Sequence, residues 1–385
     1  MLKLYNRNSG FNGLNGYLKY QKTLILFLIG IVLFSISLEY GFAKKTESNP
    51  QVRNIILFIG DGMGIGQITL ARLALVGADG QLNIDRFPYT GFLKTHSAND
   101  IVTDSAAAGT ALATGQKTNN GMIGVSSTGQ SIKTVLELAE ELGKATGLIT
   151  TVSIVHATPA AFGSHQASRS AYPEIANQII DKNIEVLLGG GRIFFIPATE
   201  SGSKRKDTRD LLQEARGNGY SVISTESQLS HETSKRILGI FADDAFIGNA
   251  QEPSLANMVS KAIERLARNK QGFFLMAEGG QIDWKAHANQ PDGVIQEMRD
   301  FDAAVGRALE FAQSRKDTLV IVTADHETGG LSVLTDKENR FRSGWNTTGH
   351  TGNMVAVFAY GPSAERFIGV LDNTDIGKII SAIIK

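Results

Sequence analysis

The stretch NIILFIGDGMGIGQ (residues 54–67) sets the fold class. The nearly unbroken apolar run 54–59 predicts a strand that is buried on both faces, and a helical pattern begins after the glycines that follow it. A glycine-rich turn between a strand and a helix is compatible with a dinucleotide site, but Asp61 would repel a pyrophosphate there. Glycines around a carboxylate favour a metal site instead, because they let the chain turn tightly and other ligands approach.

Apolar runs alternate with helical patterns along the rest of the chain. The predicted strands are 54–59, 91–96, 146–152, 184–188, 272–277, 318–323 and 354–360. The clearest helical patterns are 131–142, 172–182, 254–268, 296–312 and the C-terminal 376–385. Buried strands separated by helices predict an α/β fold, doubly wound, with a largely parallel central sheet flanked by helices. Ligands of such sheets bind outside the carboxyl ends of the strands.

Composition narrows the range of functions. The chain has 385 residues, 42% of them hydrophobic, with 38 basic and 38 acidic side chains. This balance gives no indication of a nucleic-acid partner. The absence of cysteine excludes disulfides, thiolate metal sites and cysteine nucleophiles. The length is compatible with two domains, but we interpret residues 53–385 as a single domain in which the weakly patterned region 197–250 is an elaboration.

The N-terminal segment does not belong to this domain. Basic residues up to Lys22 precede the apolar run 24–38, and the small residues Gly41 and Ala43 follow. This pattern predicts a signal peptide over residues 1–43 that directs the chain to the periplasm or the medium. The alternative is an uncleaved membrane anchor, because the apolar run is short for a span but not impossibly short. Residues 44–52 are polar and are interpreted as a linker.

Carboxylates and imidazoles recur at or near the predicted strand ends. Asp283 and His287 are four residues apart, so a helix would project both from one face; a solvated helix face is the alternative. Side chains of this kind, repeated at several strand ends, are what a two-metal hydrolytic centre needs. The set consists of Asp61, Glu278, Asp283, His287, Asp325, His326 and His350.

A candidate nucleophile lies in TDSAAAGTA (103–111). Thr103 and Asp104 are good helix caps before an alanine-rich run, which places Ser105 in the first turn of a helix. Free N–H groups and the helix dipole attract an anion at that position, so Ser105 could attack a phosphoryl group there. Read alone, the stretch favours an ordinary helix cap over a nucleophile. Arg169 offers the planar fork that suits phosphate oxygens, with a surface ion pair as its alternative.

Taken together, these segments resemble the alkaline phosphatases, a family of metal-dependent phosphomonoesterases. The matching blocks occur in family order over most of the chain after residue 53. They are IGDGMG (59–64), TDSAAAGTA (103–111), HATPA (156–160), SHQASR (164–169), EGGQIDWKAH (278–287), TADHETGG (323–330) and GHTGN (349–353). The resemblance implies an alkaline-phosphatase-like fold, phosphate monoesters as substrates, and a homodimer.

The resemblance also implies a metal site for each candidate ligand. One Zn²⁺ would be held by Asp283, His287 and His350. A second Zn²⁺ would be held by Asp61, Asp325 and His326. A third ion, usually Mg²⁺, would be held by Asp61, Thr158 and Glu278, with His156 close by. Ser105 would form a phosphoserine intermediate, Arg169 would grip the phosphate oxygens, and Asp104 would help to position that arginine.

The sequence departs from the family near the third ion. His156 takes a position that is aspartate in some members, and Trp284 takes one that is lysine or histidine in well-known members. The identity of the third ion therefore stays open, and Trp284 could simply pack beside the zinc ligands. His96, His165 and His231 have no assigned chemistry and are interpreted as structural or exposed.

Four other functions fit the sequence less well. A phosphodiesterase or nucleotide pyrophosphatase of the same superfamily commonly uses threonine and lacks the arginine, so Ser105 with Arg169 favours the monoesterase. A sulfatase needs a C/S-x-P-x-R context that the residues after Ser105 do not provide. A dinucleotide-dependent oxidoreductase would leave the carboxylates and imidazoles unexplained. A non-catalytic phosphate- or metal-binding protein would not require every catalytic position to be filled.

Overall fold

The computed structural model describes residue 21 and residues 51–182, 184–338 and 340–384. From residue 51 onward the described chain belongs to one compact unit, Pro50–Lys385. Apart from residue 21, the predicted signal peptide or anchor lies outside the described residues, as does most of the linker. Among those that are described, no helix is both long enough and apolar enough to cross a bilayer.

A ten-stranded sheet forms the centre of this unit. β13 runs antiparallel to both of its neighbours, and every other pairing in the sheet is parallel. The strands are, from edge to edge, β14 (Gly369–Asp372), β2 (Tyr89–Lys94), β13 (Val355–Tyr360), β8 (Thr318–Thr323), β1 (Asn54–Gly60), β7 (Phe273–Gly279), β3 (Ala145–Ser153), β4 (Val186–Gly190), β6 (Arg236–Ile240) and β5 (Tyr220–Ile223). β1 is buried along its whole length, as predicted for a central strand covered on both faces.

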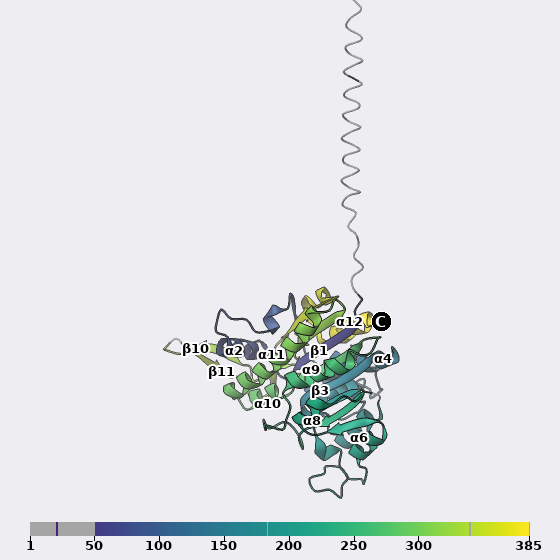
Figure 1. The fold of residues 1–385 in the computed structure, drawn as a ribbon. Coiled ribbons are helices and arrows are strands. Elements are labelled where there is room, and N and C mark those ends of the chain that lie inside the picture. The colour runs from purple at the N-terminus through teal and green to yellow at the C-terminus, as the bar shows by residue number, and fades with distance from the viewer. Residues whose placement is uncertain (1–20, 22–50, 183, 339, 385) are drawn as a thin grey trace, which may run out of the picture. The chain divides into compact units, whose positions relative to one another are not determined.

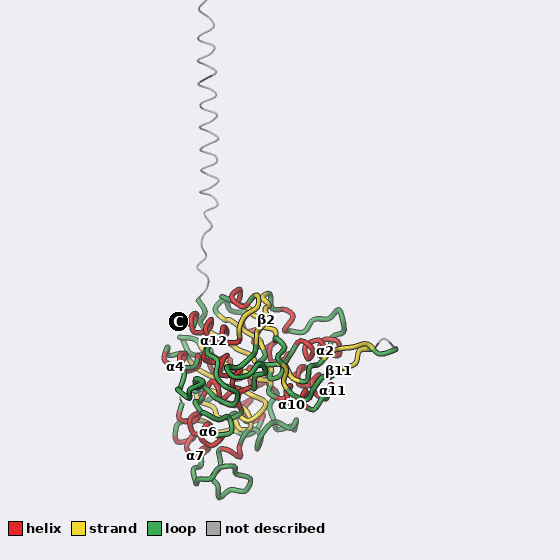
Figure 2. Tube along the Cα trace, turned by 180° about the vertical axis from the view of Figure 1, so that it is seen from behind, coloured by secondary structure: helices red, strands yellow, loops and turns green. Residues whose placement is uncertain are grey.

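Helices cover both faces of the sheet, which confirms the doubly wound α/β fold. One group packs together over β1, β3 and β7 (Figure 1): α2 (Ile65–Leu75), α9 (Leu255–Leu266) and α11 (Pro291–Gln313), with α10 (Gln281–His287) beside α11. The other group packs against the opposite face, and its α4, α6 and α12 are labelled in the view from behind (Figure 2): α3 (Ser105–Thr114), α4 (Val135–Glu141), α5 (Ala157–Gly163), α6 (Tyr172–Asp181) and α12 (Asn373–Ile383).

The region 197–250 contributes to the same sheet. It holds β5 and β6 together with α7 (Leu211–Gly217) and α8 (Glu226–His231). The two strands were not predicted, because β5 is short and only half-buried in its middle, and β6 is only five residues long. Long apolar runs mark central strands, whereas edge strands lack them.

Helix starts differ from the prediction by a few residues. α11 begins at Pro291 rather than 296, and proline suits the first turn of a helix because its missing N–H is not needed there. α4 begins after Thr134, whose hydroxyl accepts a hydrogen bond from the Glu137 amide in a capping box. The C-terminal helix likewise begins earlier, after the cap Asp372.

Smaller elements complete the unit. β10 (Ser332–Thr335) and β11 (Phe341–Gly344) form a hairpin that extends from the body (Figure 1). β9 (Glu327–Thr328) and β12 (His350–Thr351) form a short antiparallel ribbon. The 3₁₀ turns are η1 (Ile84–Arg86), η2 (Arg192–Phe194) and η3 (Ala364–Phe367).

Candidate metal centre

The candidate ligands gather at the carboxyl ends of β1, β7 and β8. Gly60, the last residue of β1, pairs with Gly279 of β7, and Ile59 pairs with Thr323 of β8. All three strands therefore end at the same level. Asp61 directly follows β1, Glu278 is the last but one residue of β7, and Asp325 follows β8. Gly62 has a φ of +71°, and a Cβ there would lie 2.8 Å from the Asp283 Cα. The glycine therefore allows the turn after β1 to pass close to α10.

One group of ligands comes from α10 and β12. The His287 Nε2 lies 3.2 Å from Asp283 Oδ2 and 3.2 Å from the His350 Nε2. The other ring nitrogens face backbone carbonyls, since His287 Nδ1 contacts the Thr348 oxygen and His350 Nδ1 lies 2.9 Å from the Thr103 oxygen. Such contacts fix a histidine ring so that its free nitrogen points at a metal. Asp283, His287 and His350 can therefore converge on one ion.

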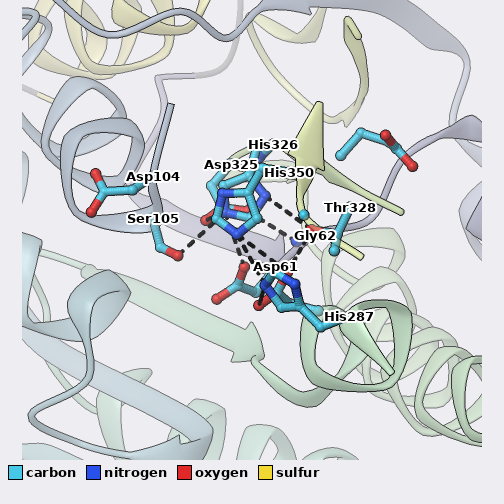
Figure 3. Close-up of polar contacts among 12 residues, drawn as sticks. Asp61, Gly62, Asp104, Ser105, His287, Asp325, His326, Thr328 and His350 are labelled. Atoms are coloured by element: carbon cyan, nitrogen blue, oxygen red, sulfur yellow. Dashed lines mark hydrogen bonds and ion pairs between the residues drawn. The ribbon is translucent and has the colours of Figure 1, made fainter. Parts of the chain in front are cut away.

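A second group surrounds His326. The His326 Nε2 lies 3.4 Å from Asp61 Oδ1 and 3.2 Å from Asp325 Oδ2. The Gly62 amide donates a 3.1 Å hydrogen bond to the other Asp325 oxygen, which leaves Oδ2 free to face the ring. The rings of His326 and His350 stack with centroids 3.6 Å apart, so the two groups are contiguous (Figure 3).

A third group lies behind Asp61. Ligand atoms of Asp61, His156 and Glu278 all lie within 4.8 Å of one another. The Thr158 hydroxyl is buried beside Glu278, and no residue of the described chain forms a well-shaped hydrogen bond with it. Trp284 packs its ring against the edge of His156, with centroids 6.3 Å apart, and stays 40% exposed. The structure therefore places Trp284 as a packing neighbour of a candidate ligand.

Four oxygens on three carboxylates of the centre have no hydrogen-bond partner among the described residues. Burial raises the pKa of Asp325 to about 6 and that of Glu278 to about 7, and burial together with the charge of Asp325 raises the pKa of Asp61 well above its usual value. Neither Asp61 oxygen accepts a hydrogen bond, nor do Asp325 Oδ2 and Glu278 Oε1. Buried carboxylates are costly unless they are paired or coordinate a cation. These unpartnered oxygens fit metal ions.

The imidazoles are suited to the same ions. Burial lowers the pKa of His326 to about 4, and burial together with the Arg169 charge lowers that of His156 to about 4. Both rings are therefore neutral near neutral pH, and His326 can offer a nitrogen lone pair, as metal binding requires. The Nε2 lone pair of His156 already accepts a 3.2 Å hydrogen bond from Arg169. The hydrogen bond to Asp283 raises the pKa of His287 to about 9, so that ring would release a proton when a metal binds.

Ser105 faces this centre from the first turn of α3. Its Oγ lies 3.2 Å from His326 Nε2 (Figure 3). Asp104 caps the helix, because its Oδ1 accepts a 3.0 Å hydrogen bond from the Ala107 amide. Asp104 Oδ2 accepts from the Gly121 amide at 3.0 Å and from Arg169 Nη1 at 3.2 Å. One carboxylate thus fixes both the helix that carries the serine and the arginine beside it.

Comparison with known proteins places this centre in a family. The model of the alkaline phosphatase family matches residues 52–339 and 331–385. This chain belongs to the alkaline phosphatase family. It is 38% identical to alkaline phosphatase 4 of Bacillus subtilis (strain 168), over 90% of this chain and 92% of that protein.

Solved structures agree with this assignment. The alkaline phosphatase of the Antarctic bacterium TAB5 superposes with a TM-score of 0.78 and 35% identity, covering 87% of this chain and 98% of that one. A mutant of the TAB5 enzyme with Mg bound in its M3 site is 34% identical, with a TM-score of 0.78 over 88% of this chain and 99% of its own. The chain is a metal-binding phosphomonoesterase of this family, and the predicted phosphodiesterase alternative is not favoured.

Sequence reasoning missed two residues that support the alkaline phosphatase site. Thr328 donates a 2.5 Å hydrogen bond to Asp283 Oδ1. Glu327 is buried and accepts hydrogen bonds from the amides of Gly330 and Leu331 at 3.2 and 3.1 Å. Both lie inside the TADHETGG block. A threonine and a glutamate at these positions do not by themselves show that Thr328 contacts Asp283 or that Glu327 binds the backbone after β9.

The remaining histidines contact residues outside the candidate ligand set or are exposed. His165 is hydrogen-bonded to Glu137, His96 lies 3.5 Å from a carboxylate oxygen of Asp372, and His231 is exposed on α8.

Proposed function

We propose that this alkaline phosphatase hydrolyses phosphate monoesters through a phosphoserine formed on Ser105, at a centre of two Zn²⁺ ions and a third cation. The observation that carries the proposal is the set of buried, unpartnered carboxylate oxygens beside the Ser105 hydroxyl. They leave a negative charge that cations would neutralise, next to a nucleophile at a helix start.

The two predicted Zn²⁺ ions have separate sets of donors. Asp283, His287 and His350 would hold one Zn²⁺, and Asp61, Asp325 and His326 would hold the other. Bound there, the cations would lower the pKa of the Ser105 hydroxyl and neutralise charge on the phosphoryl group and the leaving oxygen.

The chain's own groups then act on the substrate. Arg169 donates one hydrogen bond from Nη1 to Asp104 and one from Nη2 to His156, both at 3.2 Å. Its other N–H groups stay available for the phosphate oxygens. The Ser105 hydroxyl loses its proton to solvent water, and its Oγ attacks phosphorus. The bond to the leaving oxygen breaks, and the departing alkoxide takes a proton from water. A water molecule then hydrolyses the phosphoserine, which releases phosphate and restores the hydroxyl of Ser105.

The third cation is proposed to be Mg²⁺. Asp61, Thr158 and Glu278 offer the oxygen ligands that Mg²⁺ prefers. The nitrogen of His156 is less suited to Mg²⁺ and would favour a transition metal. Metal analysis of the purified enzyme distinguishes the two, because a third Zn²⁺ in place of Mg²⁺ would contradict the proposed occupant.

The Ser105→Ala variant tests the nucleophile. We expect p-nitrophenyl phosphate hydrolysis at alkaline pH to fall by on the order of 10³-fold or more, with metal content unchanged, because only the attacking oxygen is lost. Bis(p-nitrophenyl) phosphate should be a poor substrate of the wild type. Full activity in the variant would overturn the assignment of Ser105, and a preference for the diester would restore the phosphodiesterase alternative.

Assembly and location follow the family resemblance and the N-terminal pattern. We propose a homodimer exported to the periplasm or the medium, or held at the membrane if residues 1–43 are not cleaved. Light scattering of the purified protein measures the first, and fractionation with N-terminal sequencing measures the second.

A further inference from the structure

A cavity of about 540 Å³ lies near the carboxyl ends of the sheet strands, where the metal centre also lies. Its wall includes Ser170, Tyr172, Phe194, Lys204, Lys206 and Asp244. We propose that this cavity binds the neutral, hydroxyl-bearing part of the substrate, a sugar or a nucleoside. The inference rests on the proposed function, because it assigns the leaving group of the same reaction to a second subsite.

The position of the cavity suits that role. Phe194 and Asp244 lie in the segments that follow β4 and β6, which are the next strands of the sheet beyond β3. Neighbouring strands are about 4.8 Å apart, so the cavity begins about two strand spacings from the end of β7, which carries Glu278. In an α/β sheet this edge is where ligands collect. A leaving group about 10 Å long would span that separation.

Arg169 connects the two places. Ser170, in the cavity wall, is its direct neighbour, and consecutive Cα atoms are about 3.8 Å apart. The Arg169 amide is fixed by a 2.7 Å hydrogen bond to the Gly121 carbonyl, and its guanidinium contacts Asp104 and His156. A phosphate on this guanidinium would therefore lie within the length of one arginine side chain of the cavity wall at Ser170.

One wall of the cavity is aromatic. The rings of Tyr172 and Phe194 pack with centroids 4.8 Å apart and planes tilted by 36°. Phe194 is buried, and Tyr172, in the first turn of α6, is half-buried. Aromatic rings offer a broad apolar surface on which the C–H face of a sugar or a planar base can pack.

The rest of the wall is polar and balanced in charge. The ammonium groups of Lys204 and Lys206 are exposed and make no hydrogen bond or salt bridge within the described ranges. Carboxylates of Glu174, Asp207 and Asp244 face the same cavity, and Asp207 is paired at 2.6 Å with the buried Arg205.

Two lysines and Arg205 thus offset these three carboxylates, so the cavity selects neither a second anion nor a cation. Donors and acceptors side by side instead match hydroxyl groups, which both donate and accept hydrogen bonds.

A comparison of two substrates tests the subsite. Adenosine 5′-monophosphate carries a nucleoside that would reach the cavity, whereas ethyl phosphate has the same kind of ester bond and is too short. One variant, Tyr172→Ala, removes the aromatic wall. A second, Lys204→Met with Lys206→Met, removes the donors from exposed positions and should fold normally. Lys235→Met, an exposed lysine just before the amino end of β6, is the control.

Both cavity variants should raise KM for adenosine 5′-monophosphate about tenfold, since losing a fitted contact in a pocket changes discrimination by roughly that factor. kcat/KM for ethyl phosphate should stay within about twofold of the wild type, and the control should change neither. Parallel losses for both substrates, or no change for either, would overturn the subsite. Hydrolysis of neither substrate by the wild type would instead overturn the proposed function.

Discussion

Glu137 on α4 and Asp325 after β8 are both carboxylates withdrawn from water, yet their surroundings differ. Glu137 is hydrogen-bonded to His165 Nε2 at 2.8 Å, to Lys182 Nζ at 2.5 Å and to the Thr134 amide at 2.9 Å. Burial alone would raise the pKa of Glu137, but the contacts with His165 and Lys182 outweigh it and lower that pKa to about 2. Burial raises the pKa of Asp325 to about 6, and its Oδ2 accepts no hydrogen bond.

The difference separates a structural carboxylate from a ligand. The chain itself supplies cations and donors for Glu137, whose partner His165 also contacts the Gly124 carbonyl at 2.6 Å. This cluster ties α4 to the segment that leads to Arg169. Among the described residues, Asp325 accepts hydrogen bonds only at Oδ1, from the amides of Gly62 and His326. A full negative charge on Asp325 therefore requires a bound cation that the chain does not itself supply.

Replacing the ligand should give the largest effect. In Asp325→Asn we expect kcat/KM for p-nitrophenyl phosphate to fall by on the order of 10³-fold, because removing one preorganised charged group at a reacting centre commonly costs that much. Zinc content should fall with it. The chelated variant should be no less stable than the chelated wild type, because it loses an unpaired buried charge. Near wild-type activity with full metal content would contradict the role of Asp325.

Removing the metals from the wild type should give the next largest effect. A ligand present at 1,000 times its dissociation constant stabilises the folded state by about 4 kcal/mol. We therefore expect chelation to lower the unfolding free energy by about 4 kcal/mol or more, with a matching drop in melting temperature. Differential scanning calorimetry with and without EDTA measures the change. Asp325→Asn should show a smaller drop, and equal melting temperatures in the wild type would contradict the metal centre.

Much of the fold and the site was predictable because the signals are local. Long apolar runs marked β1, β7 and β8, whose ends carry Asp61, Glu278 and Asp325. The four-residue spacing of Asp283 and His287 placed both on one face of a helix, and α10 does bring them within 3.2 Å. Such patterns report the immediate neighbours of a residue.

Other parts depend on contacts between distant segments. His350 lies on a two-residue strand that pairs with Thr328, and no periodicity marks so short an element. β5 and β6 were missed because they have only four and five residues and neither contains a long apolar run. The sequence also does not show that Asp104 joins Gly121 to Arg169, or that Glu137 meets His165 and Lys182. These pairings become visible only when the chain has folded.

Replacing the structural carboxylate should give the smallest effect and a distinct pH dependence. Because the cluster is partly exposed, we expect Glu137→Gln to lower the unfolding free energy of the chelated protein by about 1–2 kcal/mol and activity by less than about threefold.

The pH dependence follows from the two partners. Because the pKa of Glu137 is lowered in the folded state, its carboxylate stabilises the fold above pH 4.5, and this stabilisation is lost as the pH falls toward about 2. The hydrogen bond to Glu137 raises the pKa of His165, so its contribution is present below pH 6.5 and is lost at higher pH. The difference between wild type and variant in urea unfolding should therefore be largest between pH 4.5 and 6.5. Glu141→Gln, at the exposed end of the same helix, should change stability by less than about 0.5 kcal/mol at every pH. A difference that keeps growing above pH 8 would contradict the pairing with His165.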